Sequence, residues 1–244
     1  FLRQSEGLTL MRNFLDLVYS GKLGQGIIAC DSWAWAFLQH IWRRKIPLTL
    51  TLQAFDKDRL TDYLQQFSGA LDGRKMLYRQ SDNGKYVLPH HDSEDNSINI
   101  SNFLQMLAAH SRGIFGVAYS FWRFSPRIEP DKSDLEEDDH SKDNDQALTI
   151  WITPFDQLKH PALPSAAGRD EAFVLYSLLL HNGLPLELIR QILPLSQTQV
   201  METLLILEDA GLVSHCDDIW HVLPRGYPAV REFIQSQGFL IDQF

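Results

Sequence analysis

The sequence has no apolar run close to the roughly 20 residues that a helix needs to span a bilayer, and it does not open with a signal segment. We therefore expect a cytoplasmic protein with no membrane segment. Cysteine is scarce: Cys30 and Cys216 lie far apart, which predicts neither a disulfide framework nor a metal site. With 244 residues, of which 44% are hydrophobic, the chain is long enough for one large or two modest domains.

Sequence motifs that name a reaction are also missing. The chain has no G-x-x-x-x-G-K-[ST] loop, no Gly-x-Ser-x-Gly elbow and no His-Glu-x-x-His pair. The glycines between Gly21 and Gly26 have no Lys-Ser or Lys-Thr after them, and His90-His91-Asp92 lacks further metal ligands at suitable spacing. The sequence therefore predicts no metal site and gives no support for a hydrolase with a serine triad.

The acidic charge is concentrated in one segment. Nine acidic and two basic residues between Glu129 and Asp145 contribute −7 of the formal net charge of −9, so the remainder of the chain carries only −2. Such a block predicts a solvated, disordered acidic loop over residues 128–146. We do not infer a general repulsion of nucleic acid from the total charge.

Helix and strand patterns alternate in the first quarter of the chain. We expect helices over 6–19, from Ser32 to about residue 42, and over 57–67, with buried strands over 27–30 and 48–52 between them. This order predicts parallel strands joined by right-handed crossovers. Two strands are too few for such a sheet, and the chain begins at Phe1, so we expect a fragment whose other strands precede it.

The middle and the end of the chain are mainly helical. A hairpin is expected around Asp82-Asn83-Gly84, two helices over 101–109 and 114–124, and a strand over 147–152. After a Pro/Ala/Gly linker, three helices (171–181, 186–193, 197–210), a hairpin (212–215 with 219–223) and a last helix (228–237) describe a winged helix.

The predicted fold class is α/β plus mainly α: a partial P-loop-type parallel sheet, a helical lid and a C-terminal winged helix. The expected segments are the distal part of an α/β nucleotide-binding domain (1–68), an insertion and lid (69–127), the acidic loop (128–146), a short strand and linker (147–169), and the winged-helix domain (170–244).

Four segments together resemble the C-terminal half of AAA+/STAND-like P-loop ATPases of the origin-recognition type. They are FLRQSEGLTLMRNFLDL, IIACDSWAWAFL, FLQMLAAHSRGIFGVAYSFW and the terminal winged helix. The resemblance covers most of the chain in order. It implies that ATP and Mg²⁺ bind only together with phosphate-binding and acidic segments that would precede Phe1, so that this chain alone is inactive.

The resemblance also implies roles for four residues. Asp31 or Ser32 matches the polar residue, sensor 1, that orients the water attacking the γ-phosphate. Arg112 and Gly113 match the turn of the lid that contacts bound nucleotide, but Gly116 stands where the family has its sensor 2 arginine. From the residues alone, Asp31 also reads as a helix cap, and Trp33 and Trp35 as packing residues.

The candidate recognition helix, 197–210, has Gln197 and Gln199 but no basic residue, and it carries Glu202, Glu208 and Asp209. The acidic residues of this helix would repel phosphate, so we favour a protein partner over DNA for the winged helix. The leading hypothesis is the C-terminal portion of a P-loop ATPase whose lid and winged helix couple nucleotide state to that partner, with a homo-oligomer possible. The alternatives are a winged-helix transcriptional regulator with a non-catalytic ligand-sensing domain, and a non-enzymatic protein-docking scaffold.

Overall fold

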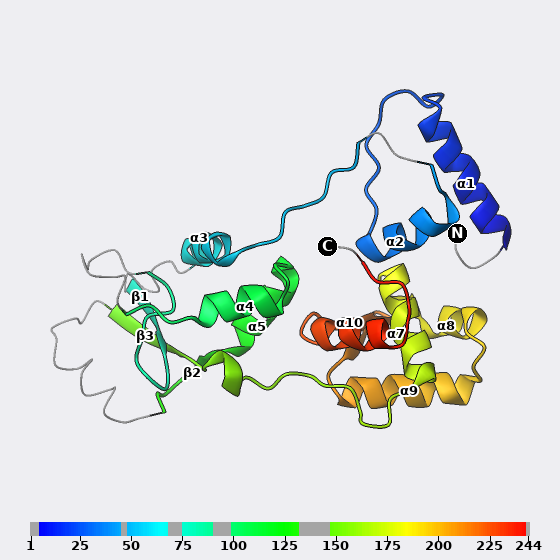
Figure 1. Cartoon of the computed structure of the whole chain (residues 1–244). Coiled ribbons are helices and arrows are strands. Elements are labelled where there is room, and N and C mark those ends of the chain that lie inside the picture. The colour runs from blue at the N-terminus through cyan, green and yellow to red at the C-terminus, as the bar shows by residue number, and fades with distance from the viewer. Residues whose placement is uncertain (1–4, 45–47, 68–74, 90–98, 132–146, 243–244) are drawn as a thin grey trace. The chain divides into compact units, whose positions relative to one another are not determined.

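The computed structural model describes residues 5–44, 48–67, 75–89, 99–131 and 147–242 (Figure 1). Within these residues the protein is mixed α/β, with nine α-helices and two three-stranded sheets. The chain divides into two compact units. Unit 1 comprises residues 1–51 with 161–244, and unit 2 comprises residues 52–160.

The C-terminal part of unit 1 packs helices and a small sheet around one core. Its elements are α7 (Arg169–His181), β4 (Leu184–Pro185), α8 (Leu186–Ile192), α9 (Gln197–Asp209), β5 (Val213–Cys216), β6 (Ile219–Val222) and α10 (Tyr227–Ser236). The sheet has the order β4–β6–β5, with both pairs antiparallel. The helices and the hairpin predicted here are confirmed to within two residues at their ends, whereas β4 was not predicted.

Local signals explain why these elements begin and end where they do. The Ser196 hydroxyl accepts a hydrogen bond from the Gln199 N–H, and the Gln199 side chain accepts one from the Ser196 N–H, which forms a capping box at the start of α9. After α7, Gly183 has φ +97°, and a Cβ there would lie 2.2 Å from the His221 ring. Only glycine allows this turn to pass so close to β6.

Two N-terminal helices also belong to unit 1. Helix α2 (Ser32–Ile41) packs against α7, and its Trp33 is part of the same core as α7 to α10. Helix α1 (Ser5–Tyr19) is joined to the residue after α2, because the Trp42 indole donates to Asp16 at 2.9 Å and packs edge-on against Tyr19. The predicted helices over 6–19 and from Ser32 are therefore confirmed.

The two predicted buried strands are wrong. Residues 27–30 and 48–52 belong to no strand, and their side chains are exposed, with Ile27 at 99% and Leu52 at 97%. Cys30, which we expected to be buried, is exposed as well. A strand is stable only when a neighbour pairs with its backbone N–H and C=O groups, and among the described residues neither segment has such a neighbour.

Unit 2 contains a different parallel pair. Strands β1 (Lys75–Gln80) and β3 (Ala147–Ile152) run parallel, and β2 (Pro126–Arg127) lies antiparallel on the other side of β3. Helices α3 (Lys57–Phe67), α4 (Phe103–His110) and α5 (Phe115–Phe124) and the 3-10 turn Phe155–Gln157 complete the unit. The predicted helices and the strand over 147–152 are confirmed. Of the hairpin predicted around residues 82–84, the structure shows the turn and an isolated antiparallel bridge between Arg79 and Tyr86, but residues 86–88 form no strand.

Two predictions fall on residues outside the described ranges. These are most of the acidic loop, residues 132–146, and the His90-His91-Asp92 sequence. Across the described part of the chain, no helix is both long enough and apolar enough to cross a membrane.

Candidate functional site

The polar tip at residues 31–33 is the first part of the predicted site. Asp31 is the N-cap of α2: its Oδ1 accepts a hydrogen bond of 2.9 Å from the Trp33 N–H, while the rest of the residue is exposed. The role of Asp31 as a helix cap, one of the two interpretations of the sequence, is therefore present in the structure. Trp33 is buried at 4% exposure, so the packing interpretation of this residue is confirmed.

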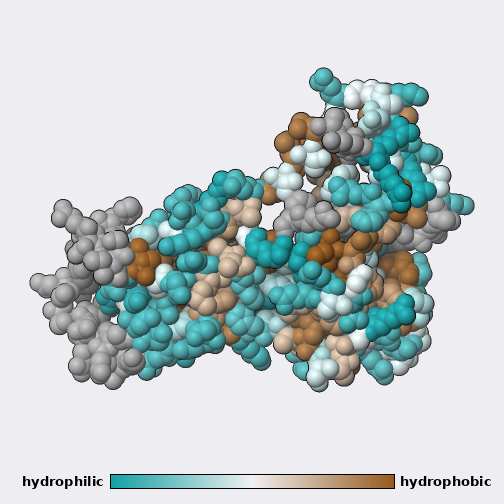
Figure 2. Space-filling model, in the orientation of Figure 1, coloured by the Kyte–Doolittle hydropathy of each residue, from teal (hydrophilic) through white to brown (hydrophobic). Residues whose placement is uncertain are grey.

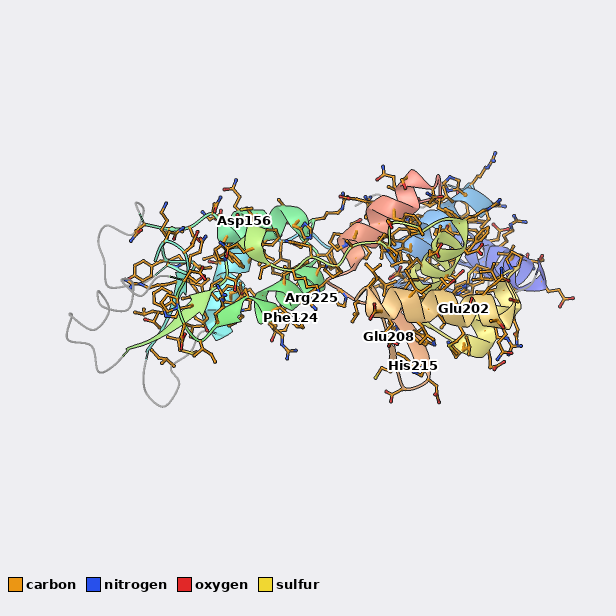
Figure 3. All side chains as sticks on the ribbon, turned by 90° about the horizontal axis from the view of Figure 1, so that it is seen from below. Phe124, Asp156, Glu202, Glu208, His215 and Arg225 are labelled. Carbon is orange, nitrogen blue, oxygen red and sulfur yellow. The ribbon has the colours of Figure 1, made fainter. Side chains whose placement is uncertain are left out.

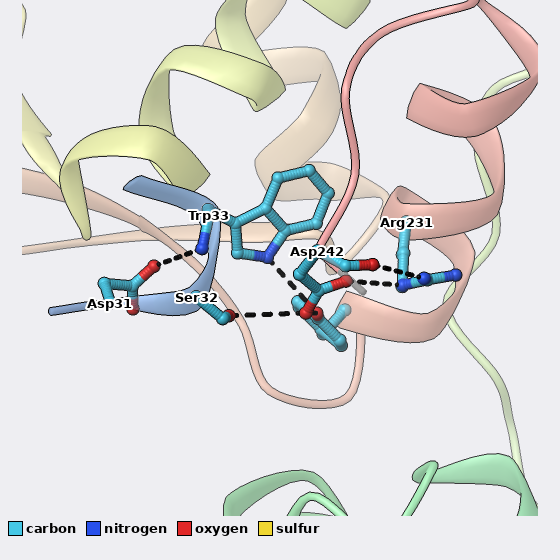
Figure 4. A network of polar contacts seen from close by, with 6 residues as sticks. Asp31, Ser32, Trp33, Arg231 and Asp242 are labelled. Carbon is cyan, nitrogen blue, oxygen red and sulfur yellow. Dashed lines mark hydrogen bonds and ion pairs between the residues drawn. The ribbon is translucent and has the colours of Figure 1, made fainter. Parts of the chain in front are cut away.

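Ser32 and Trp33 join a hydrogen-bond network with the C-terminal residues (Figure 4). The Ser32 hydroxyl donates to Asp242 Oδ2 at 3.3 Å, and the Trp33 indole N–H donates to the Tyr227 hydroxyl at 3.2 Å. The Tyr227 hydroxyl in turn donates to Asp242 Oδ2 at 2.8 Å. The start of α2 is thus tied to α10 and to the segment that follows it.

A buried ion pair forms the centre of this network. Arg231 Nε donates to Asp242 Oδ1 at 2.8 Å, and Arg231 Nη2 donates to the Asp242 backbone oxygen at 2.9 Å. The two side chains are 9% and 5% exposed. A buried pair of this kind is tolerated only when hydrogen bonds satisfy the remaining polar atoms, and here Tyr227 and Ser32 supply them.

The network also determines the protonation of Tyr227. Burial, followed by the negative charge of Asp242 and the hydrogen bond to it, raises the pKa of the Tyr227 phenol well above its ordinary value. Tyr227 therefore stays a neutral donor to Asp242 at neutral pH. The Asp242 side chain accepts from Arg231, Tyr227 and Ser32, and it therefore holds these three residues together.

Arg112 and Gly113 lie in unit 2, at the turn between α4 and α5. Both have positive φ, +54° at Arg112 and +71° at Gly113. The Gly113 carbonyl accepts a hydrogen bond of 2.9 Å from the Phe55 N–H, and a Cβ on Gly113 would lie 2.5 Å from that of Ala54. Glycine is thus required for close backbone packing, whatever further role the turn has.

The four predicted site residues fall in two places. Asp31 and Ser32 belong to unit 1, whereas Arg112 and Gly113 belong to unit 2. Arg112 is exposed, and Gly116, which stands where the family has its arginine, is exposed at the start of α5. Among the described residues, no group of three or more His, Cys, Asp or Glu side chains could hold a metal ion.

Sequence reasoning missed Tyr227, Arg231 and Asp242. A signal was available for Arg231, since it lies on the buried face of α10 between Pro228 and Ile234 at a spacing of three residues. A charged residue on a buried helical stripe needs a buried partner. Nothing local in the sequence identifies Asp242 as that partner.

Comparison of the chain with protein-family models, with curated proteins and with solved structures found no match.

Proposed function

We propose that this chain is the C-terminal portion of an ATP-binding P-loop ATPase, in which residues 170–244 form a winged helix that couples nucleotide state to a protein partner. The element order supports the winged helix: helix α7, strand β4, helices α8 and α9, and the hairpin β5–β6 surround one core.

One observation carries the ATPase part of the proposal. The segments 27–30 and 48–52 have the apolar and alternating patterns of sheet strands, yet their large side chains are exposed, at 99% for Ile27, 72% for Leu48, 85% for Leu50 and 97% for Leu52. Figure 2 shows hydrophobic residues, in brown, reaching the surface of the molecule. Such patterns are stable as strands when neighbouring strands bury them. The parallel sheet of a P-loop domain is the neighbour that the resemblance implies.

The chain's own residues do not make a complete nucleotide site. The sequence contains no phosphate-binding loop, and its described residues include no cluster of metal ligands. ATP and Mg²⁺ binding is therefore proposed only together with the upstream part of the domain.

The hydrogen-bond network at Ser32 supports a coupling between the start of α2 and the C-terminal helices. Ser32, matched to the nucleotide-sensing position, contacts Asp242, which is anchored to α10 by Arg231 and Tyr227. A change at Ser32 would therefore alter one of the hydrogen bonds that Asp242 accepts.

The experiment begins with the coding sequence immediately upstream of Phe1, where we expect a GxxxxGK[ST] loop followed by a strand that ends in acidic residues. The extended protein is expected to hydrolyse ATP in the presence of Mg²⁺, and the 244-residue chain is not. The matched variant Ser32→Ala should lower turnover of the extended protein. Mg²⁺-dependent turnover by the pure 244-residue chain, or a start codon directly before Phe1, would contradict the proposal.

The alternative of a DNA-binding regulator is disfavoured by the start of α9. The Gln199 side chain accepts hydrogen bonds from the N–H and the hydroxyl of Ser196, so it folds back onto the helix start. These bonds occupy the Gln199 Oε1, and no basic residue lies on α9 to hold phosphate.

A further inference from the structure

A groove lies between the first turn of α7 and the side of α9. Its volume is about 430 Å³, and its lining includes Arg169, Asp170 and Glu171 from α7 and Glu202 and Ile206 from α9. Three of these side chains are acidic and one is basic. Arg169 stacks on the Phe173 ring, with its guanidinium carbon 5.1 Å from the ring centroid.

The outward face of α9 continues from this groove and is partly apolar. Leu205 is 52% exposed and Ile206 is 49% exposed. Glu202 and Asp209, which are also exposed, lie one turn before and one turn after them. This α9 face, defined as Glu202, Leu205, Ile206 and Asp209, therefore presents two large apolar side chains between two carboxylates.

The acidic charge of the α9 face is not balanced by any basic residue on the same helix. Acidic residues at the start of α7 are favoured by the helix dipole, and Glu171 also accepts a hydrogen bond of 2.7 Å from the Gly168 N–H. Glu202, in contrast, lies in the middle of α9, which has no Lys or Arg to pair with it along the helix. Among the described residues, the side chains of Glu202 and Asp170 have no hydrogen-bond or ion-pair partner. In Figure 3, Glu202 and Glu208 lie along α9, and His215 lies on the hairpin.

We propose that the α9 face and the adjoining groove bind an amphipathic helix of a partner protein, with apolar residues against Leu205 and Ile206 and Lys or Arg residues against Glu202 and Asp170. The charge decides the class of partner, because this surface would repel both the phosphates of DNA and an acidic peptide. Amphipathic helices commonly bind to protein surfaces in this way, through apolar residues of the bound helix that are spaced one turn apart. The proposal deepens the proposed function by naming the chemistry of the partner of the winged helix.

Two synthetic helical peptides test the proposal. They share the same leucine stripe, and their polar positions are all lysine in one and all glutamate in the other. Fluorescence anisotropy with the full chain should show binding of the lysine peptide and none of the glutamate peptide. The double variant Leu205→Ala/Ile206→Ala should weaken binding of the lysine peptide about tenfold, since each anchor loses apolar contact. Glu202→Gln should weaken it as well and reduce its dependence on salt.

Matched controls separate this surface from the overall negative charge. Asp217→Asn removes one acidic charge at the turn of the hairpin, where φ is +50° and asparagine is tolerated, and Leu23→Ala removes an apolar side chain that is 57% exposed. Both should bind the lysine peptide like the parent chain. Equal losses in the controls and in the α9 variants would overturn the proposal, and so would equal binding of both peptides or no binding of either.

Duplex DNA provides the remaining comparison. We expect no salt-dependent binding of a duplex, and tighter binding of duplex than of the lysine peptide would overturn the proposal in favour of nucleic acid. These measurements need no nucleotide. A negative result here therefore leaves the ATPase proposal intact, and an inactive extended protein leaves the peptide result intact.

Discussion

The buried pair Arg231–Asp242 leads to a quantitative prediction for Asp242→Asn. The substitution keeps the shape of the side chain but removes its charge, which leaves the Arg231 guanidinium uncompensated at 9% exposure. Losing one partner of a buried ion pair typically costs about 3–5 kcal/mol. We expect a value near 3 kcal/mol because the asparagine oxygen and the backbone oxygen of residue 242 still accept from Arg231.

Hydrogen exchange followed by mass spectrometry is the appropriate assay, because it reports on unit 1 separately from unit 2. Peptides from α2 and α10 should exchange about 100-fold faster in Asp242→Asn, since 1.4 kcal/mol corresponds to about tenfold. Peptides from α4 and α5 should not change. The matched control is Glu187→Gln, which breaks the exposed pair with Arg190 and is expected to cost less than about 1 kcal/mol.

A double variant examines the same reasoning from the other side. Replacing both Arg231 and Asp242 with apolar residues removes the uncompensated charge, so the double variant should be less destabilised than the sum of the two single variants.

One result of the exchange experiment would refute the predicted cost of breaking the buried ion pair. If the α2 and α10 peptides exchanged no faster in Asp242→Asn than in Glu187→Gln, the Arg231–Asp242 pair would be screened by water.

Two further predictions concern single residues. Gly113→Ala should lower the free energy of unfolding by about 2 kcal/mol, because a Cβ at φ +71° would lie 2.5 Å from the Ala54 Cβ. The control is Gly116→Ala, which should be neutral or stabilising because a Cβ there meets nothing within 4 Å. Equal melting temperatures of the two variants would contradict this explanation. The raised pKa of Tyr227 stabilises the fold fully below the unfolded pKa of about 10, and this contribution is lost as the pH rises towards the folded pKa, because the unfolded chain releases its proton first. Tyr227→Phe should therefore cost about 1 kcal/mol at pH 7 and lose less stability than the parent above about pH 10, as measured by urea unfolding; parallel curves would exclude this linkage.

The sequence predictions were accurate where they rest on residues a few positions apart, and they failed where the structure depends on distant neighbours. The C-terminal elements were predicted because each has a local start or stop, such as the capping box of Ser196 with Gln199 and the glycine at φ +71° after α9. The strands over 27–30 and 48–52 were predicted from their side-chain pattern, which cannot say whether a neighbouring strand is present. The pattern correctly identified two apolar segments, but it did not show whether neighbouring strands cover them.

The candidate site also combines a local pattern, which the sequence shows, with a long-range contact, which it does not show. The sequence directed attention to Asp31 and Ser32 because they precede a helix and match a position of the family that the chain resembles, and their role in a nucleotide site stays a prediction. Their contact with Asp242 joins residues 210 positions apart. No spacing rule connects such residues, so the partners of Ser32 became visible only once the chain was folded.

The geometry at Ser32 limits how strongly the proposed nucleotide site can be coupled to the winged helix. A serine hydroxyl has one proton, so it cannot donate to a phosphate oxygen and to Asp242 at the same time. If nucleotide takes that hydrogen bond, Asp242 still accepts from Tyr227 and Arg231, and the ion pair stays intact. The coupling through this atom is then the value of one hydrogen bond, about 0.5–1.5 kcal/mol, or about two- to tenfold in a binding constant. Stronger coupling than this requires that α2 itself moves, because only that movement would also displace Trp33 from the core and from Tyr227.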